Sequence, residues 1–576
     1  MRRNRFLPFF IVIVITFLAA YSHAQLWSGV LSPTRAIDWS QAGAGTIPNR
    51  TTICTTLSAG ATAAQINSAI SSCASGGVVM LNAGTYNLSG QLNTKANVTL
   101  RGAGPDKTLI VFSSCGSGNG LGTCIYTANP EGGDYSGGPS NTANWTAGYA
   151  KGTTSITLSS VSNLHVGSLL ILDGTDGTQS DPGDAIWVCT STSCSEQGLD
   201  GISGRSGRAQ QQQVIVTSIS GTTVGITPGI YSPNWASGRS PGAWWSSSLP
   251  ISGAGIEGIS VNTNAVTSQY GSIFMFHNAA NSWIKNVRSI NLGSRSDNQH
   301  KHVWIYQSSH ITVRDSYFVG SNSASESYGV DSGASSSDNL VENNIFQHIA
   351  TATINESSTG SVFGYNFTVD NNYNNGAPEW QQCDSYHHSA GDSYILWEGH
   401  TGDCWQMDSI HGSSWMNTVF RSRYSGRDNS KTAQTNAIHV YSTNRYHNVV
   451  GDVLGTSGYH THYETTATTA TQDGGSTGDL SIYSIGFSGN ESGHTFMDDP
   501  RSGTSLMRWG NYDTVNAAVR WVAGENASGS AVYPGVAGPT QTLPASFYLN
   551  SEPAWWGSVP WPPIGPDVVG GNIANV

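Results

Sequence analysis

The stretch over residues 384–424 gathers the side chains of this chain that could do acid–base chemistry. Charged residues make up only 11% of the sequence. This window nevertheless combines acids, imidazoles, guanidiniums and indoles: Asp384, His387, His388, Asp392, Trp397, Glu398, His400, Asp403, Trp405, Asp408, His411, Trp415, Arg421 and Arg423. A chain poor in charge that concentrates such groups is expected to do its chemistry there. A polar loop held together by local salt bridges would have the same composition.

The carboxylates in and before this window favour cleavage of a glycosidic bond. Hydrolysis needs one carboxylic acid to protonate the leaving oxygen and a second carboxylate as base or nucleophile. We predict that Asp408 and Glu398 form this pair, that His411 orients a carboxylate and that Arg421 holds a substrate hydroxyl or carboxylate. The residues that we expect to bind the sugar chain are Asp331, Glu356, Asp384, Trp304, Trp397, Trp405, Arg423 and His439.

Two alternatives remain open. β-Elimination from a uronate needs a base, together with a cation or metal that neutralises the sugar carboxylate. The residues that could serve it are Arg421, Arg423, His411, His387, His388 and Lys301. A solenoid that binds glycans without cleaving them is the alternative from a different class.

Repeated short strands are the elements that must position these residues. A three-residue pattern recurs from about residue 253 to 487: an apolar residue, then a polar or small one, then Asn, Asp, Gly or a charged residue. It recurs at steps of about 21–34 residues, a range typical of solenoid coils. Side chains alternate in and out along each strand, so equivalent residues form columns. We expect one column to bring Glu398, Arg421 and Asp452 into ion-pair range. We expect a second, outward row to contain Trp304, Asp331, Asn355, Asp408 and His439, with Glu356 and His411 at its edge and with Val330, Ile354, Met407 and Ile438 pointing inward.

Residues 61–112 predict a helix followed by short strands. The pattern over 61–73 places Ala64, Ile66, Ile70 and Cys73 on one helical face, and Gly76-Gly77 ends the helix. With the strand-like runs that follow, this segment resembles the opening of pectin-lyase-like, right-handed parallel β-helix proteins. The resemblance implies an all-β solenoid with a helical N-terminal cap. It implies no particular activity, because the fold hosts lyases, hydrolases, epimerases and phage tailspikes.

The best-known active-site motifs of that superfamily do not occur in the sequence. Residues 302–307 (HVWIYQ) resemble the vWiDH signature of pectate lyases, but Tyr306 and Gln307 replace its Asp and His. The RxPxxR motif is absent, as are the NTDG, GHG and RIK motifs of polygalacturonases. The missing lyase motifs, the abundant carboxylates and the 18 tryptophans favour hydrolysis of a polysaccharide.

The chain divides into five predicted parts. Arg2, Arg3 and Arg5 precede an apolar run over 6–20, and small residues at 22–24 suit a cleavage site, which predicts a secretory signal peptide over 1–24 and an extracellular or periplasmic protein. The other parts are the cap and first coils over 25–144, an inserted β subdomain or irregular coils over 145–250, the main β-helix with the active groove over 251–490, and a C-terminal strap over 491–576.

Bulk composition limits the partners and cofactors. The formal net charge of -12 argues against nucleic acid and anionic membranes. We therefore expect a monomer that binds polysaccharide. Export and short spacing predict local disulfides Cys54/Cys73, Cys115/Cys124, Cys189/Cys194 and Cys383/Cys404. We expect no metal centre and no required cofactor, although the Asp-rich loop over 173–184 could bind Ca²⁺.

Overall fold

The computed structural model describes residues 25–131, 140–176, 205, 207–267, 270–292, 300–321, 327–374, 378–428, 431–470, 480–488, 497–530 and 532–570. The predicted signal peptide and the Cys189/Cys194 pair lie outside these ranges. Within them, no helix is long and apolar enough to cross a membrane.

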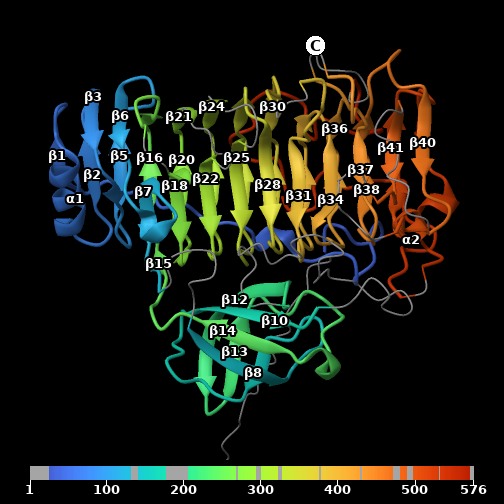
Figure 1. Cartoon of the computed structure of the whole chain (residues 1–576), viewed down its shortest axis with the longest axis horizontal. Coiled ribbons are helices and arrows are strands. Elements are labelled where there is room, and N and C mark those ends of the chain that lie inside the picture. The colour runs from blue at the N-terminus through green and yellow to red at the C-terminus, as the bar shows by residue number, and fades with distance from the viewer. Residues whose placement is uncertain are drawn as a thin grey trace, which may run out of the picture.

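Three long sheets of mostly parallel strands wind the chain into a right-handed β-helix, as predicted (Figure 1). The front sheet, whose strands run downward at the front of Figure 1, contains β4 (Leu92–Asn93), β7 (Thr123–Ala128), β18 (Ser272–His277), β22 (His300–Tyr306), β25 (Ser327–Gly333), β28 (Thr351–Glu356), β31 (Ser385–Ser389), β34 (Trp405–His411), β37 (Ile438–Val440), β41 (Ser481–Ile485) and β40 (His462–Thr466).

The two remaining sheets close the helix. The covered sheet contains β1 (Ile53–Leu57), β2 (Val78–Leu81), β5 (Thr99–Gly102), β16 (Gly255–Glu257), β20 (Trp283–Lys285), β23 (Thr312–Arg314), β26 (Leu340–Glu342), β29 (Val362–Gly364), β32 (Leu396–Glu398), β35 (Thr418–Phe420), β38 (Asn448–Val450) and β42 (Met507–Trp509). The third sheet contains β3 (Gly84–Ser89), β6 (Thr108–Ser114), β17 (Ser260–Asn262), β21 (Arg288–Leu292), β24 (Tyr317–Ser321), β27 (Ile345–Gln347), β30 (Phe367–Val369), β33 (Thr401–Gly402), β36 (Arg423–Tyr424), β39 (Val453–Leu454), β43 (Asn511–Asp513) and, antiparallel to β43, β44 (Ala518–Arg520).

A column of left-handed residues turns the chain from the covered sheet to the third sheet. Its members have φ between 48° and 68°: Asn286, Asp315, Asn343, Tyr365, Gly399, Arg421 and Gly451. The backbone N–H of each donates to a carbonyl of the next coil, so the turns form a ladder. Asparagine, aspartate and glycine tolerate this conformation best, which explains why they recur at these positions.

The register of the covered sheet corrects one predicted column. Glu398 aligns with Gly364 and Phe420 inside the sheet, whereas Arg421 lies in the turn that follows β35. Asp452 comes one residue after the equivalent turn residue, Gly451. The expected ion-paired column of Glu398, Arg421 and Asp452 was therefore wrong, because the three residues occupy different positions in their coils.

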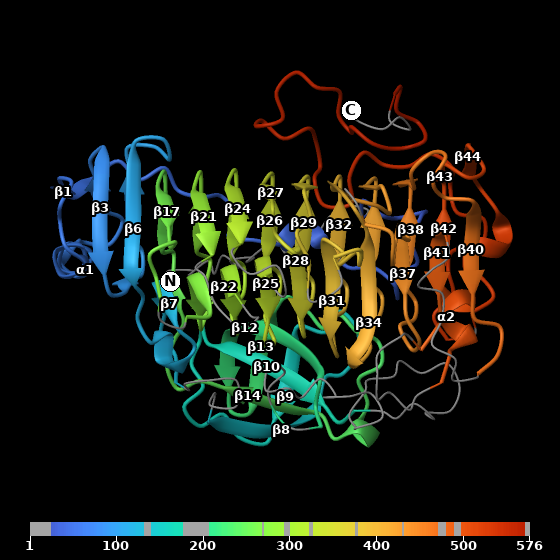
Figure 2. The same cartoon turned by 45° about the horizontal axis from the view of Figure 1, so that its top comes forward.

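Two irregular segments cover the outer side of the covered sheet. The N-terminal segment, residues 25–50, runs along the whole helix: Arg35 donates to the His447 and Ser505 carbonyls, both at 2.8 Å, and Arg50 donates to Thr99 Oγ1 at 3.0 Å. The strap, residues 532–570, follows the last coil and lies across the top of the molecule in Figure 2. The helix itself continues through α2 (Pro500–Ser505) and β42 to β44, beyond the predicted boundary at residue 490.

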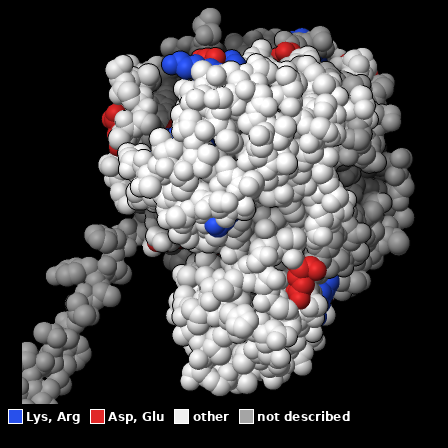
Figure 3. All heavy atoms as spheres, turned by 90° about the vertical axis from the view of Figure 1, so that its left-hand side faces the viewer, with Lys and Arg blue, Asp and Glu red and all other residues white. Residues whose placement is uncertain are grey.

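A short helix closes the N-terminal end, as predicted. Helix α1 (Ala63–Ser72) begins with a capping box between Thr62 and Gln65. Its buried face contains Ala63, Ile66 and Ile70, whereas Ala64, predicted to lie on the same face as Ile66 and Ile70, is exposed. Seen from this end, the surface carries only scattered charged side chains, consistent with the low charge of the sequence (Figure 3).

The inserted β subdomain is a closed barrel. Its antiparallel strands are β8 (Asn141–Ala147), β9 (Ser155–Leu158), β10 (Leu169–Gly174), β12 (Gln210–Ser220), β13 (Thr223–Thr227) and β14 (Gly242–Trp245). The barrel lies below the lower ends of the front strands in Figure 1. It is attached to the turns that follow these strands: the Gln213 N–H donates to Ser337 Oγ at 3.0 Å, and the Thr359 hydroxyl donates to the Gln211 carbonyl at 3.0 Å.

Disulfides link Cys54 to Cys73, Cys115 to Cys124 and Cys383 to Cys404, which confirms three of the four predicted pairs. The first bond joins β1 to the end of α1. The third joins the residues that lead into the front strands β31 and β34.

Candidate functional site

The outward row of the front sheet agrees with the sequence prediction at both ends and differs in the middle. Hydrogen-bonded register aligns Trp304, Asp331, Ile354, Tyr386, Gln406 and His439. Trp304, Asp331 and His439 therefore occupy the predicted row. Ile354, predicted to point inward, occupies the place expected for Asn355, which aligns with the inward Ser332 and His387.

A second outward row lies two residues further along each strand. Glu356 pairs in register with Gly333, two residues after Asp331. A register irregularity between His387 and Ser389 brings His388 beside Asp408 of the next strand. The structure therefore brings predicted residues from both rows, and His388 with them, onto one outer face.

Lys301 joins two carboxyl groups on this face. Its Nζ lies 3.2 Å from Glu356 Oε2, forms an ion pair with Asp331 Oδ2 and lies 3.9 Å from the centroid of the Trp304 ring. All four residues are at most 4% exposed. The group Lys301, Trp304, Asp331 and Glu356 is called the carboxyl cluster below.

The two carboxyl groups hold their protons with different affinities. Burial and then the neighbouring Glu356 carboxylate raise the pKa of Asp331 well above its ordinary value. Burial alone would also raise the pKa of Glu356. The Lys301 ammonium, a hydrogen bond with Asp331 and the nearby His388 outweigh burial and leave the pKa of Glu356 below its ordinary value. The pair therefore keeps a proton, and this proton resides mainly on Asp331.

His388 and Asp408 form a close pair beside the carboxyl cluster. His388 Nδ1 lies 2.6 Å from Asp408 Oδ2, and the Tyr386 hydroxyl donates to the same oxygen. The rings of His388 and His411 meet edge to face at 4.5 Å. The His388 side chain is 16% exposed, whereas that of Asp408 is fully buried. Solvent therefore reaches this face at the imidazoles.

Glu398 and Arg421 lie on a different side of the helix, beneath the strap. Glu398 accepts hydrogen bonds from the Tyr365 hydroxyl at 2.9 Å and the Phe547 N–H at 2.7 Å. Arg421 forms a bidentate pair with Asp567 at 2.7 and 2.8 Å. Burial raises the pKa of Glu398 to about 7. The structure does not bring these two residues to Asp408, and their contacts attach the strap.

The remaining predicted residues lie in three places. Trp397 and Trp405 are fully buried in the interior of the helix, where Trp397 stacks on Phe363 with ring centroids 4.9 Å apart. His439 lies on the outward row, with Nε2 3.2 Å from the Gln434 carbonyl oxygen. Asp384 and Arg423 line a cavity at the corner between the third and front sheets. Neither indole can stack on a sugar from the interior, so neither belongs to the outer face of the front sheet.

Sequence reasoning gave too little weight to Lys301, His388 and Tyr386. Lys301 and His388 were considered only for elimination, and Tyr386 was not considered. The outward parity of β31, counted from Tyr386, is the signal that could have joined His388 to Asp408. Parity counted from Trp304 places Lys301 on the inward set, so no periodic signal indicated Lys301.

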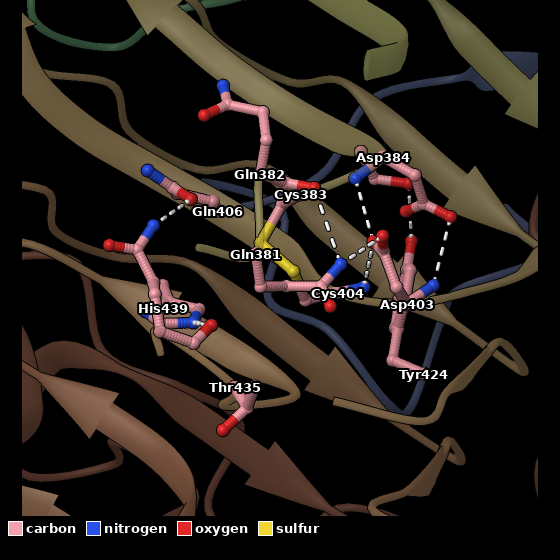
Figure 4. The surroundings of a disulfide bond; sticks show 12 residues. Gln381, Gln382, Cys383, Asp384, Asp403, Cys404, Gln406, Tyr424, Thr435 and His439 are labelled. Carbon is pink, nitrogen blue, oxygen red and sulfur yellow. Dashed lines mark hydrogen bonds between the residues drawn. A yellow bond between two sulfur atoms is a disulfide. The ribbon is translucent and has the colours of Figure 1, made fainter. Parts of the chain in front are cut away.

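Metal-binding groups are sparse in the described ranges. The one set of potential ligands within 4.8 Å of one another is Cys383, Cys404 and His439. The two cysteines form a disulfide (Figure 4), so neither offers a thiolate. In the loop over 173–184, Asp173 is paired with Arg205 at 2.5 Å and Arg208 at 2.8 Å, and residues 177–184 lie outside the described ranges.

No protein-family model matches the chain, and no curated protein matches it. The chain is similar to solved structures with low identity. The tailspike protein gp49 of Pseudomonas phage LKA1 is 13% identical over 71% of this chain and 60% of its own, with a TM-score of 0.45. The Gp54 tailspike of Acinetobacter baumannii bacteriophage AP22, solved with a capsular saccharide, is 10% identical over 77% and 62%, with a TM-score of 0.38. The A-module of the Azotobacter vinelandii mannuronan C-5 epimerase AlgE6 is 12% identical over 69% and 84%, with a TM-score of 0.33.

This chain thus spans less than two thirds of the length of either tailspike. The assignment of the β-helix rests on its own sheet topology.

Proposed function

We propose that this chain hydrolyses a glycosidic bond of a polysaccharide on the outer face of the front sheet. The observation that carries the proposal is the pair of buried carboxyl groups, Asp331 and Glu356, with pKa values shifted in opposite directions beside one ammonium group. Titratable groups whose environments push their pKa values apart are the usual arrangement for acid–base catalysis.

The proposed roles follow from the positions of the groups. The Asp331–Glu356 pair supplies the proton that the leaving glycosidic oxygen takes up as its bond to the anomeric carbon breaks. His388, oriented by Asp408, takes a proton from the water whose oxygen bonds to that carbon. A proton then passes back to the carboxyl pair, and the reaction consumes one water per bond.

The carboxyl pair is too close to act as the two separate carboxylates of a glycosidase. Asp331 and Glu356 are within hydrogen-bonding reach of each other, whereas the two catalytic carboxyl groups of a glycosidase stand about 5 Å or more apart to admit the sugar. The base therefore has to come from another group. His388 is the partly exposed candidate, and it lies near Glu356.

A polysaccharide panel tests the proposal. Each digest is read for new reducing ends and for the absorbance of unsaturated uronates. Hydrolysis predicts reducing ends without that absorbance, and it predicts their loss in Glu356→Gln. Asp106→Asn is the matched control, since that carboxylate is 84% exposed and lies in an early coil. Unchanged cleavage by Glu356→Gln would contradict the proposal.

Elimination is the second candidate, and one observation favours it. The carboxyl cluster contains an ammonium group, and an imidazole lies beside it, so a cation and a base are present together. Unsaturated products that rise in step with the reducing ends would select elimination over hydrolysis. Loss of both readouts in His388→Gln would then identify its base.

A further inference from the structure

A polar cavity opens at the corner between the third and front sheets, away from the carboxyl cluster. Its volume is about 160 Å³. The residues that line it are Phe346, Ile349, Ala352, Thr368, Val369, Asn371, Asp384, Thr401, Gly402, Asp403, Arg423, Ser425, Arg427 and Asp428. Val369 is 41% exposed, so this corner cavity reaches the surface.

Arg423 brings a guanidinium group to the corner cavity. The rest of the described chain offers this guanidinium no hydrogen-bond or ion-pair partner. Its backbone N–H donates to the His400 carbonyl, but its side chain has no hydrogen bond or ion pair within the described ranges. Two residues earlier, Arg421 has its guanidinium fully occupied by the strap. A partly buried guanidinium without a partner is suited to bind a carboxylate through two parallel hydrogen bonds.

Asp384 brings an acceptor to the same cavity. Its Oδ2 accepts the Asp403 N–H at 3.0 Å and the Thr368 hydroxyl, and it lies 3.3 Å from His400 Nε2. Its Oδ1 is buried without a hydrogen-bond partner in the described chain, and the residue is 3% exposed. A buried carboxylate oxygen without a donor costs free energy unless a ligand supplies one.

The neighbouring groups hold Asp384 in place. Asp403 Oδ1 accepts the N–H groups of Asp384 at 2.8 Å and of Cys404 at 2.6 Å, and its Oδ2 accepts from Asn371 at 3.0 Å and from Gln381. The Cys383–Cys404 disulfide joins the residues next to both acids (Figure 4). The oxygens of Asp403 are therefore occupied, and Asp384 Oδ1 is the acceptor left for a ligand.

Exposed apolar side chains lie beside the corner cavity on the outer face of the third sheet. Phe367 is 45% exposed and aligns in register with Thr401, which aligns with Arg423 on the next strand. Ile345 aligns with Phe367 on the other side and is 47% exposed. An aromatic ring next to hydrogen-bonding groups offers the apolar surface on which the C–H face of a sugar packs.

We propose that the corner cavity binds a single hexuronate unit, with its carboxylate on Arg423, a hydroxyl donating to Asp384 Oδ1 and its apolar face toward Phe367. The volume is below the range of about 300–1,000 Å³ for drug-sized ligands, which fits one sugar ring. The guanidinium and the occupied oxygens of Asp403 disfavour a cation there. The site is separate from the carboxyl cluster and does not depend on the proposed cleavage.

Ligand-observed NMR titration of the whole mature protein with sodium D-glucuronate tests this site, with D-glucose as the neutral counterpart. We expect millimolar binding of glucuronate that weakens at least about tenfold in Arg423→Ala. We expect glucose to bind more weakly than glucuronate, and Arg423→Lys to fall between Arg423→Ala and the unchanged protein. Arg288→Gln is the matched control, because the Arg288 guanidinium of the same sheet is already occupied by Asp106 at 3.0 Å and by the Pro105 carbonyl.

The same titration on Glu356→Gln separates this site from catalysis. Unchanged glucuronate binding by Glu356→Gln, together with loss in Arg423→Ala, supports the corner cavity whether or not the chain cleaves polysaccharide. Binding that survives Arg423→Ala, or that disappears in Glu356→Gln, would overturn it. Absence of binding at 50 mM glucuronate would also overturn it.

Discussion

His388 Nδ1 lies 2.6 Å from Asp408 Oδ2, at the point where the outer face of the front sheet reaches solvent. An imidazole that donates its Nδ1–H to a carboxylate presents Nε2 as its proton acceptor. Asp408 also accepts from Tyr386 and from the Ile410 N–H, so the carboxylate is held from three sides. We propose that Asp408 is a positioning residue and that His388 takes the proton from the attacking water.

Asp408→Asn is expected to lower kcat by about 10²–10⁴-fold while leaving KM nearly unchanged, because an amide no longer fixes the imidazole tautomer. Steady-state kinetics at neutral pH measure kcat and KM. A fall in kcat that only matches a loss of folded protein would point to structural damage and against this assignment.

Lys301→Met is expected to destabilise the fold more at neutral than at acid pH. Lys301 holds the folded-state pKa of Glu356 low, so ionised Glu356 contributes stability above its unfolded pKa. Without the ammonium, the folded pKa rises above the unfolded value, and stability then falls as pH rises. Removing one partner of a buried pair costs about 3–5 kcal/mol.

Urea unfolding of Lys301→Met at pH 4.5 and 7.5 measures this difference. Lys285→Met is the control, because Lys285 lies in the covered sheet away from the carboxyl cluster. An equal loss of stability at both pH values would contradict the predicted role of the ammonium.

Arg421→Ala is expected to lower stability by about 2–4 kcal/mol without changing cleavage at 25 °C. The substitution leaves the carbonyls of Leu543, Pro544 and Ile564 without their donor and removes the pair with Asp567. Arg423→Ala, two residues away, removes a guanidinium without such contacts and should change the free energy of unfolding by less than about 1 kcal/mol. Activity lost at 25 °C while the variant is still folded would support the catalytic role expected from the sequence.

The strap should loosen as pH rises toward 8. The folded pKa of Glu398 is about 7 and its unfolded value about 4.3, so its contribution to stability is fully present below pH 4.3 and is lost as pH rises through 7. The loss is on the order of 3 kcal/mol for a fully buried group. The free energies of unfolding at pH 5 and at pH 8 should therefore differ less in Glu398→Gln than in the unchanged protein. An equal pH dependence of the unfolding free energy in the two proteins would exclude Glu398 as the cause of the lost stability.

Replacing Cys383 and Cys404 by serine should cost about 3 kcal/mol and weaken glucuronate binding. The bond closes a loop with a sequence separation of 21 residues, and Cys383 and Cys404 adjoin Asp384 and Asp403 of the corner cavity. The Cys115/Cys124 pair, replaced in the same way, is the control because it lies in an early coil. Thermal unfolding and the NMR titration read the two effects. Equal weakening of binding by both double variants would indicate a general loss of folding.

The coils could be predicted because each repeats the same local chemistry. An apolar residue followed by a residue that tolerates left-handed backbone recurs at Asn286, Asp315 and Asn343, and this pattern located the covered sheet. Parity within the front strands then placed Trp304, Asp331 and His439 on the outer row. These features depend on neighbours in the sequence and on a fixed strand period.

The strap could not be predicted by the same reasoning. Glu398 accepts from Phe547 across 149 positions, and Arg421 binds Asp567 across 146. No sequence repeat relates the strap to the coils that it covers. In the sequence, Glu398 and Arg421 therefore could not be distinguished from catalytic residues, although their partners in the strap stabilise the fold. The register irregularity between His387 and Ser389 likewise shifts β31 relative to β34, and no periodic sequence pattern predicts this shift.

The N-terminal segment also affects the order in which the chain can fold. Arg35 bonds to His447 and Tyr533, at separations of 412 and 498 residues, so this early segment finds those partners only after nearly the whole chain has been synthesised. Coils that contact only their neighbours could form one after another from either end. Here the last step joins the beginning of the chain to its end, and truncation of the final coils should leave a segment undocked at the opposite end of the sequence.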